Sequence, residues 1–216
     1  PIAGGGYKTV DEYLEAAKDT NADVIYYATD KVAQAQYVSM LQGQGIAVAV
    51  LDKLIDTQFI NVVEQDKKIK FARVDSDVAA ALKGDGEDFK DDKLAELFKK
   101  VSGEEKLEVK FENLKDERVP AMLTVSEESR RFEDMMKMYR MSGGEGDKGF
   151  NMPREATLVL NASNPLIKKL SGRDDDAASA AAKQIYRLAL LSQRQLTAEE
   201  LQSFLYDSYD MLDKKF

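Results

Sequence analysis

The chain of 216 residues contains no cysteine and no histidine. Without cysteine it cannot form disulfide bonds or use a thiol nucleophile, and without either residue type it cannot build the usual zinc sites. Catalysis by a histidine general base is excluded for the same reason. The lack of cysteine is typical of proteins from a reducing compartment.

Long apolar segments are also missing. The longest apolar run, Ile46–Leu51, is far shorter than the ~20 residues of a membrane-spanning helix. Residues 1–17 have neither the basic region nor the apolar core of a signal peptide, so we expect none. The net charge of -8 disfavours binding to nucleic acid phosphates and to anionic membranes. We therefore expect neither a nucleic acid nor a membrane as a partner.

Motifs for nucleotide binding and acid–base catalysis are absent too. The sequence has no G-x-x-x-x-G-K-[ST] motif, and Gly143, Gly144, Gly146 and Gly149 do not have the G-x-G-x-x-G spacing. Acidic residues are numerous, but none lies in the apolar setting that tunes a pair of carboxylates for catalysis. We predict no catalytic residue and no metal site. A nucleotide- or metabolite-binding α/β enzyme domain remains an alternative that rests on fold class alone.

The first part of the chain is predicted to form a parallel βαβ unit. Two apolar strands, Asp23–Thr29 and Ile46–Leu51, flank a helix of about three turns at Lys31–Leu41. Together with its neighbours this unit predicts a small three-layer α/β/α domain. The neighbouring elements are a helix that begins with the capping box Thr9–Glu12, a helix at Leu54–Val63 and a strand at Lys70–Val74.

A charged segment with two glycines, Lys83–Asp92, is predicted to link two domains, residues 1–88 and residues 89–216. It does not have the residue order of an EF-hand calcium loop. The second domain is predicted to be α+β. Its elements are a helix at Lys93–Val101, strands at Leu107–Phe111, Pro120–Val125 and Ala156–Leu160, and a short helix that starts at Asn164-Pro165. The Asn161-Ala-Ser163 glycosylation sequence is expected to be accidental.

The last forty residues are predicted to form two helices, Ala177–Gln193 and one that begins with the capping box at Thr197. Their apolar faces exceed what a small sheet can cover. We therefore predict a homodimer in which the two helices of each protomer close a four-helix bundle across a two-fold axis. The predicted interface residues are Ala178, Ala181, Ala182, Ile185, Leu188, Ala189, Leu201, Phe204, Leu205 and Leu212.

The segment Phe132–Met141 holds four of the eight methionines. Phe132, Met136 and Tyr139 fall on one helical row, and methionine repacks readily against partners of different shape. A glycine-rich, charged segment follows at residues 143–149. Two interpretations are open, a core helix rich in methionine and an exposed binding surface. The candidate binding residues are Phe132, Met135, Met136, Met138, Tyr139 and Met141.

Five segments resemble the heat-shock protein 90 chaperones, and within that family the bacterial branch of high-temperature protein G. They read YYATDKVAQAQ, LQGQGIAVAVLDKLIDTQFI, VPAMLTVSEES, LVLNASNPLIKKL and IYRLALLSQ, and they span residues 26–193. The resemblance implies the end of the middle domain followed by the C-terminal dimerisation domain. It also implies that the ATP-binding domain and the catalytic arginine lie outside this chain. The full-length family uses ATP and magnesium, but we expect no cofactor and no enzymatic activity in this portion.

The resemblance also implies roles for the two apolar surfaces. Helices matching residues 177–193 and 197–214 would form the dimer bundle. The helix matching residues 129–141 would lie exposed in the dimer cleft and contact non-native client proteins. The chain ends in LDKKF instead of the acidic MEEVD tail of cytosolic eukaryotic relatives, so we expect no cochaperone that recognises that tail. A cytoplasmic bacterial heat-shock chaperone is the expected whole. A dimer clamp without client contacts is the structural alternative.

Overall fold

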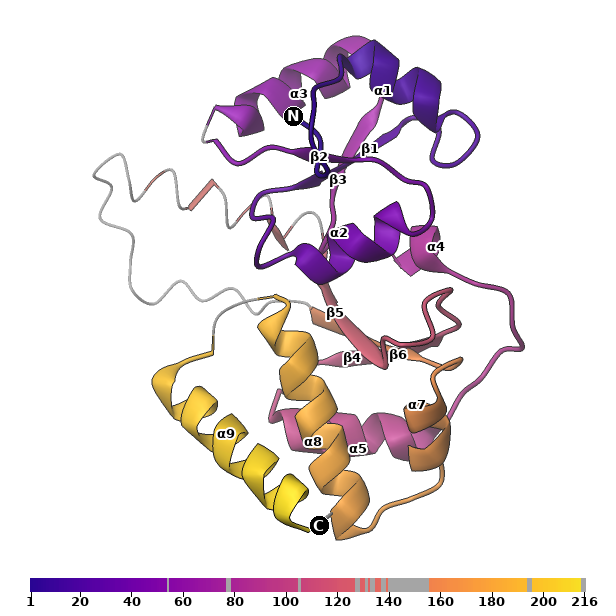
Figure 1. The fold of residues 1–216 in the computed structure, drawn as a ribbon, viewed down its shortest axis with the longest axis vertical. Helices are drawn as coiled ribbons and strands as arrows, with labels where there is room; N and C mark the ends of the chain where they lie inside the picture. The colour runs from indigo at the N-terminus through magenta and orange to yellow at the C-terminus, as the bar shows by residue number, and fades with distance from the viewer. Residues whose placement is uncertain are drawn as a thin grey trace. The chain divides into compact units, whose positions relative to one another are not determined.

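The computed structural model describes residues 1–53, 55–76, 79–104, 106–126, 129–130, 132, 135–136, 139, 156–193 and 196–214. The chain forms two compact units (Figure 1). Unit 1 comprises Pro1–Leu82 and Val125–Glu155, and unit 2 comprises Lys83–Thr124 and Ala156–Phe216. Each contains helices and a three-stranded sheet, so the mixed α/β class is confirmed. The predicted domain boundary at residue 88 stays a prediction.

The sheet of unit 1 is parallel, with strand order β2-β1-β3. In its register Tyr26 of β1 lies opposite Val48 of β2 and Ala72 of β3. A helix follows each of the first two strands, as parallel connections require. The predicted βαβ unit is therefore confirmed. The elements are β1 (Val24–Ala28), α2 (Ala35–Gln42), β2 (Val48–Val50), α3 (Asp56–Lys67) and β3 (Lys70–Arg73).

Helices cover this sheet with apolar side chains. On one face, α1 (Val10–Ala17) and α3 pack against Ile25, Tyr27 and Phe71, and in Figure 1 α2 lies on the other side of the strands. The capping box of α1 is confirmed, because the Glu12 amide donates to Thr9 Oγ1 and the Thr9 amide donates to the Glu12 carboxylate. A short helix, α4 (Ala79–Leu82), was not predicted.

Unit 2 contains a second sheet, with strand order β4-β6-β5 and β4 parallel to β6. Its core joins α5, α7 and α8 to the strands through apolar residues such as Phe98, Leu158 and Ile167. The predicted helices and strands are all present at nearly the expected positions. They are α5 (Asp92–Ser102), β4 (Glu108–Glu112), β5 (Ala121–Val125), β6 (Ala156–Asn161), α7 (Pro165–Leu170), α8 (Asp176–Leu191) and α9 (Ala198–Asp213).

The charged segment that was predicted as a link is bonded to unit 2. Lys83 forms an antiparallel bridge with Leu114, and the Gly84 amide donates to the Asn113 carbonyl over 2.6 Å. The Asn113 side-chain amide donates in turn to the Glu87 carbonyl over 2.9 Å. Residues 83–87 are therefore held against the loop after β4.

Asn161 is fully buried at the end of β6 and makes four side-chain hydrogen bonds. Its Oδ1 accepts from the Leu114 and Ser163 amides, and its Nδ2 donates to the Asp116 and Val119 carbonyls, over 2.9–3.1 Å. The side chain thus replaces the missing backbone partners of the loop between β4 and β5. The Asn161 side-chain nitrogen, Nδ2, is therefore hydrogen-bonded in the folded chain.

We expect Asn161→Ala to lower the free energy of unfolding of unit 2 by about 2–3 kcal/mol, because it leaves buried backbone groups without partners. Urea denaturation followed by circular dichroism measures the change. Asn61→Ala, at an exposed position of α3, is the control and should have little effect. Equal stability of the two variants would contradict the role assigned to Asn161.

Candidate functional site

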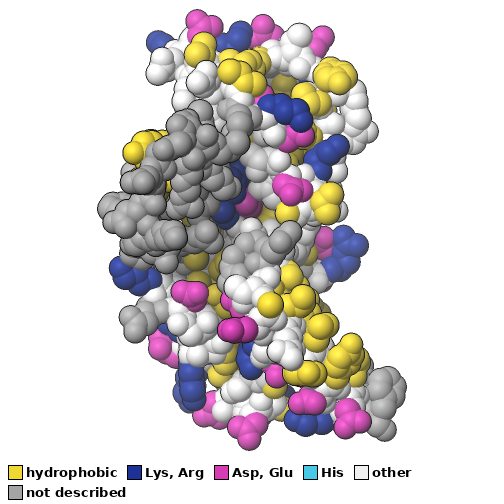
Figure 2. All heavy atoms as spheres, turned by 90° about the vertical axis from the view of Figure 1, so that its left-hand side faces the viewer, with side chains coloured by type: hydrophobic (Ala, Val, Ile, Leu, Met, Phe, Trp, Pro, Cys, Tyr) yellow, Lys and Arg dark blue, Asp and Glu magenta, His cyan; other side chains and the backbone are white. Residues whose placement is uncertain are grey.

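The α9 helix has no buried residue along its sixteen positions. Leu201, Leu205 and Leu212 lie on one side of it and are 41–54% exposed. Hydrophobic side chains gather at the lower right of the face shown in Figure 2. Isolated exposed leucines are common on protein surfaces, but a row of them marks a contact surface. The exposed large apolar residues of α8 and α9 are Leu188, Leu191, Leu201, Leu205, Tyr206, Tyr209, Met211 and Leu212.

Polar side chains join α9 to α8. Gln184 donates to Ser208 Oγ over 2.6 Å, Arg187 donates to Ser203 Oγ over 2.8 Å, and Lys183 pairs with Asp207 at 2.9 Å. Arg187 also bonds to Asp207. Burial raises the pKa of Asp207, but the hydrogen bonds and charges of Lys183 and Arg187 outweigh it, so that this pKa lies below its ordinary value. Because these bonds hold the two helices together, the leucines of α9 remain on the outside.

The predicted dimer residues separate into two groups. Four of those on α8 are buried in the core of their own unit, and Ala181 is partly buried against the same core. The alanines among them are small and allow α8 to approach the rest of the core closely. Phe204 is half-buried, and the predicted residues that are exposed are Leu188, Leu201, Leu205 and Leu212. The buried ones are Ala178, Ala182, Ile185 and Ala189.

The methionine-rich segment belongs to unit 1. Its described residues are helical, and Met135 and Tyr139 are 55% and 54% exposed. Phe132 and Met136 are half-buried. The two exposed residues lie four positions apart in the sequence. Met138 and Met141 lie outside the described residues.

Ser126, Ser129 and Arg130, which precede this segment in the chain, are held by hydrogen bonds and by an ion pair. Ser126 Oγ accepts from the Ser129 amide over 3.2 Å, as a helix N-cap does, and the Ser126 carbonyl accepts from the Arg130 amide over 3.0 Å. The Arg130 side chain is 6% exposed, and its Nη2 lies 3.4 Å from Asp75 Oδ2. Arg130 is therefore attached to the turn that follows β3.

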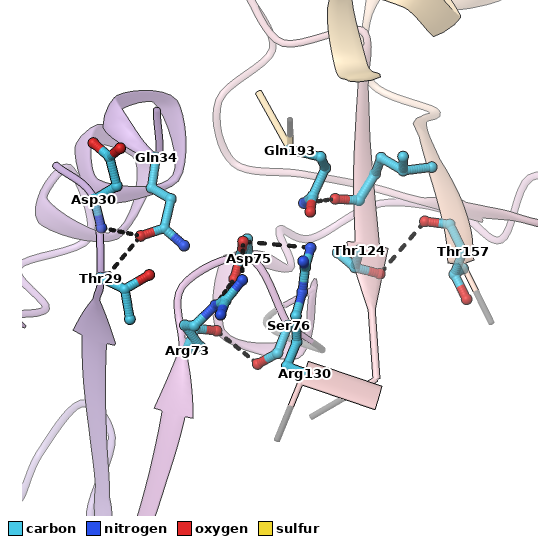
Figure 3. Close-up of polar contacts among 11 residues, drawn as sticks. Thr29, Asp30, Gln34, Arg73, Asp75, Ser76, Thr124, Arg130, Thr157 and Gln193 are labelled. Carbon is cyan, nitrogen blue, oxygen red and sulfur yellow. Dashed lines mark hydrogen bonds and ion pairs between the residues drawn. The ribbon is translucent and has the colours of Figure 1, made fainter. Parts of the chain in front are cut away.

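Asp75 is the centre of a buried polar cluster, shown in Figure 3. Arg73 binds its carboxylate with two hydrogen bonds, of 2.7 and 3.1 Å. Burial raises the pKa of Asp75, but Arg73, Arg130 and Gln34 together lower it below its ordinary value. Asp75 is therefore ionised at neutral pH. The sequence does not reveal this cluster, since charged residues far apart in the sequence give no pattern that indicates their contact.

Among the described residues, no group of three or more acidic side chains is arranged to hold a metal ion. Within the same residues, none of the helices combines the length and apolar character that crossing a membrane requires.

Comparisons with known proteins identify the family. The model described as Hsp90 protein matches residues 3–216. The chain is 32% identical over 193 residues to the chaperone protein HtpG of Bacteroides fragilis strain YCH46, which covers 82% of this chain and 28% of that protein. The corresponding values for HtpG of Bacteroides thetaiotaomicron are 31%, 78% and 27%. For an endoplasmin homolog of Arabidopsis thaliana they are 23%, 87% and 24%.

The chain thus spans about a quarter of the length of the curated relatives that it matches. The family match extends over nearly every residue, through both compact units. It confirms the resemblance drawn from the five sequence segments. The chain therefore belongs to the Hsp90 family, as a C-terminal portion of the HtpG type.

Proposed function

We propose that this chain forms a homodimer through α8 and α9 and binds non-native client proteins within an ATP-dependent chaperone of the cytoplasm. The main support for the dimer is the surface of α9. This helix is sixteen residues long, has an exposed apolar row and contains no buried residue. A helix with such a row gains stability by burying it against a partner. The polar bonds between α8 and α9 leave that row available.

A second copy of the same two helices is the partner that fits best. Two helices from each protomer form a four-helix bundle when a two-fold axis relates them. In this arrangement Leu188 of α8 and the three leucines Leu201, Leu205 and Leu212 of α9 face the partner. The alanines of α8 keep their place in the core of their own protomer.

The client-binding part of the proposal is supported by the methionine-rich segment. Met135 and Tyr139 are both helical, lie four positions apart and offer exposed apolar surface. Flexible, polarisable methionine side chains adapt to partners of varied sequence, which a chaperone needs. Joining two protomers at α8 and α9 would present two such surfaces to one client and raise their effective concentration for it.

The proposal places no catalytic residue and no bound cofactor in this chain. ATP and magnesium would act in a part of the whole protein that lies outside the matched quarter. Client proteins and the second copy are the proposed partners, without nucleic acid, membrane or a cochaperone that recognises an acidic tail.

We expect the double variant Met135→Ser, Tyr139→Ser to suppress aggregation of a thermally denatured test protein about tenfold less well per mole of dimer. Each substitution removes exposed apolar surface from the proposed contact, worth about 1–2 kcal/mol when buried. Light scattering against chaperone concentration measures the loss, and sedimentation should show an unchanged dimer.

The matched control is Tyr7→Ser with Val32→Ser, which removes two even more exposed apolar side chains from unit 1. This control should suppress aggregation as well as the original chain. If the Met135, Tyr139 variant also retained full suppression, the client-binding proposal would be wrong and a dimer clamp without client contacts would remain.

A further inference from the structure

We infer that Gln184 and Ser208 form a polar layer that sets the alignment in which two protomers pair through α8 and α9. The inference rests on the homodimer proposed above and names the residues that select its alignment. It starts from one hydrogen bond of 2.6 Å, which Gln184 Nε2 donates to Ser208 Oγ across the two helices. The structure describes every residue of α8 and α9, so each helix can be followed turn by turn.

Ser208 belongs to the exposed row of α9. Successive residues of an α-helix are turned by about 100°, so positions 201, 205, 208 and 212 fall within an arc of about 60°. Leucine occupies positions 201, 205 and 212, and the half-buried Ser208 lies between the last two of them. The spacing of four, three and four residues is that of the contact positions in helix bundles. Ser208 is therefore the polar member of a row otherwise lined by leucine.

Gln184 has the corresponding place on α8. Positions 177, 180, 184, 188 and 191 fall within an arc of about 80° on that helix. The other four positions are alanine or leucine, and all four are exposed in the protomer. Gln184 is half-buried among them. The polar members of the two rows are thus bonded to each other, with apolar residues before and after them on both helices.

The side-chain amide of Gln184 is only partly satisfied. Its Nε2 donates to Ser208, whereas its Oε1 is buried and has no hydrogen-bond partner within the described protomer. An unsatisfied buried acceptor lowers stability. The neighbouring bonds of Lys183 and Arg187 to Asp207 already join the two helices. A polar residue that is not needed to join its helices and that lowers stability is typical of a device for specificity.

A polar layer in an apolar contact surface discriminates between alignments of two protomers. A shift of one protomer by a helical turn would exchange leucine and polar positions across the interface. Leucine side chains of the partner would then press against the amide and the hydroxyl, and polar groups that face hydrocarbon are costly. Shifted alignments are therefore disfavoured, as they are by a single buried polar residue in a coiled coil.

The test uses the absence of cysteine from the chain. One cysteine at a time is introduced into the two rows, and disulfide formation between protomers is followed by electrophoresis under oxidising conditions. A disulfide forms only where two Cα atoms approach within about 7 Å, so we expect the fastest position to cross-link at least about tenfold faster than the slowest. In the double variant Gln184→Leu, Ser208→Ala the four rates should differ less than about threefold, because several alignments coexist. The four cysteine variants are Leu188→Cys, Leu191→Cys, Leu201→Cys and Leu212→Cys.

Two further variants show whether the polar groups themselves are responsible. Ser208→Thr keeps the hydroxyl and should keep the original cross-linking pattern. The matched control Gln65→Leu, Ser39→Ala makes the same two exchanges at exposed helical positions of unit 1 and should keep it as well. An unchanged pattern in Gln184→Leu, Ser208→Ala would overturn the inference, and sedimentation as a dimer would then leave the proposed homodimer standing. Sedimentation of the original chain as a monomer would refute the homodimer and the inference together.

Discussion

The double variant Leu201→Glu, Leu205→Glu will convert the proposed dimer into a monomer at micromolar concentration. Both side chains are more than 40% exposed in the single chain, so the fold of the protomer should tolerate the change. In the dimer each carboxylate would be buried without a partner, at a cost of several kcal/mol. We expect the dissociation constant to rise at least about a thousandfold, equivalent to about 4 kcal/mol. Analytical ultracentrifugation measures it.

The control carries the same added charge elsewhere. Tyr7→Glu with Val32→Glu alters two exposed apolar residues of unit 1 and should leave the dimer intact. Circular dichroism should show equal helix content in both double variants. A Leu201, Leu205 variant that still sedimented as a dimer would remove α9 from the interface.

The second large effect is expected for Asp75→Ala, which should destabilise unit 1 by about 3–5 kcal/mol. The substitution leaves the buried guanidinium groups of Arg73 and Arg130 without their carboxylate, and breaking a buried ion pair from one side is far more costly than losing an exposed one. Hydrogen exchange of the β1 and β3 amides reports the change. Asp11→Ala, which breaks an exposed pair with Lys67, is the control and should leave exchange nearly unchanged.

The same variant has a defined pH dependence. Because the pKa of Asp75 is lower in the folded chain than in the unfolded one, its stabilising contribution is complete above the unfolded pKa of about 4. It is lost as the pH falls through the lower folded value. The original chain and Asp75→Ala should therefore differ fully at pH 7 and converge only in acid. A difference that vanished between pH 5 and 7 would contradict this assignment.

Local patterns predicted most of the secondary structure correctly. The capping boxes at Thr9 and Thr197 are both formed, because an N-cap depends on residues three positions apart. The apolar strands on either side of α2 form the parallel sheet, as their lack of alternation indicates. The single-turn helix α4 was missed, since four residues carry no helical period.

Partners of the apolar faces were harder to predict from sequence. The period of α8 shows that Ala178, Ala182 and Ile185 share a face, but it does not show whether that face meets its own sheet or a second protomer. The structure buries them in their own unit. The contact of Asp75 with Arg130 had no sequence signal, since charged residues are usually solvated and these two belong to distant segments.

The buried cluster has a consequence for the order in which the protein is made. Gln34, Arg73 and Asp75 all precede Arg130 in the chain, and domains fold from the N-terminal side during synthesis. The ribosome therefore delivers Arg73 and Asp75 before it delivers Arg130. The ion pair between Arg130 and Asp75 can therefore form only after at least 130 residues have been synthesised.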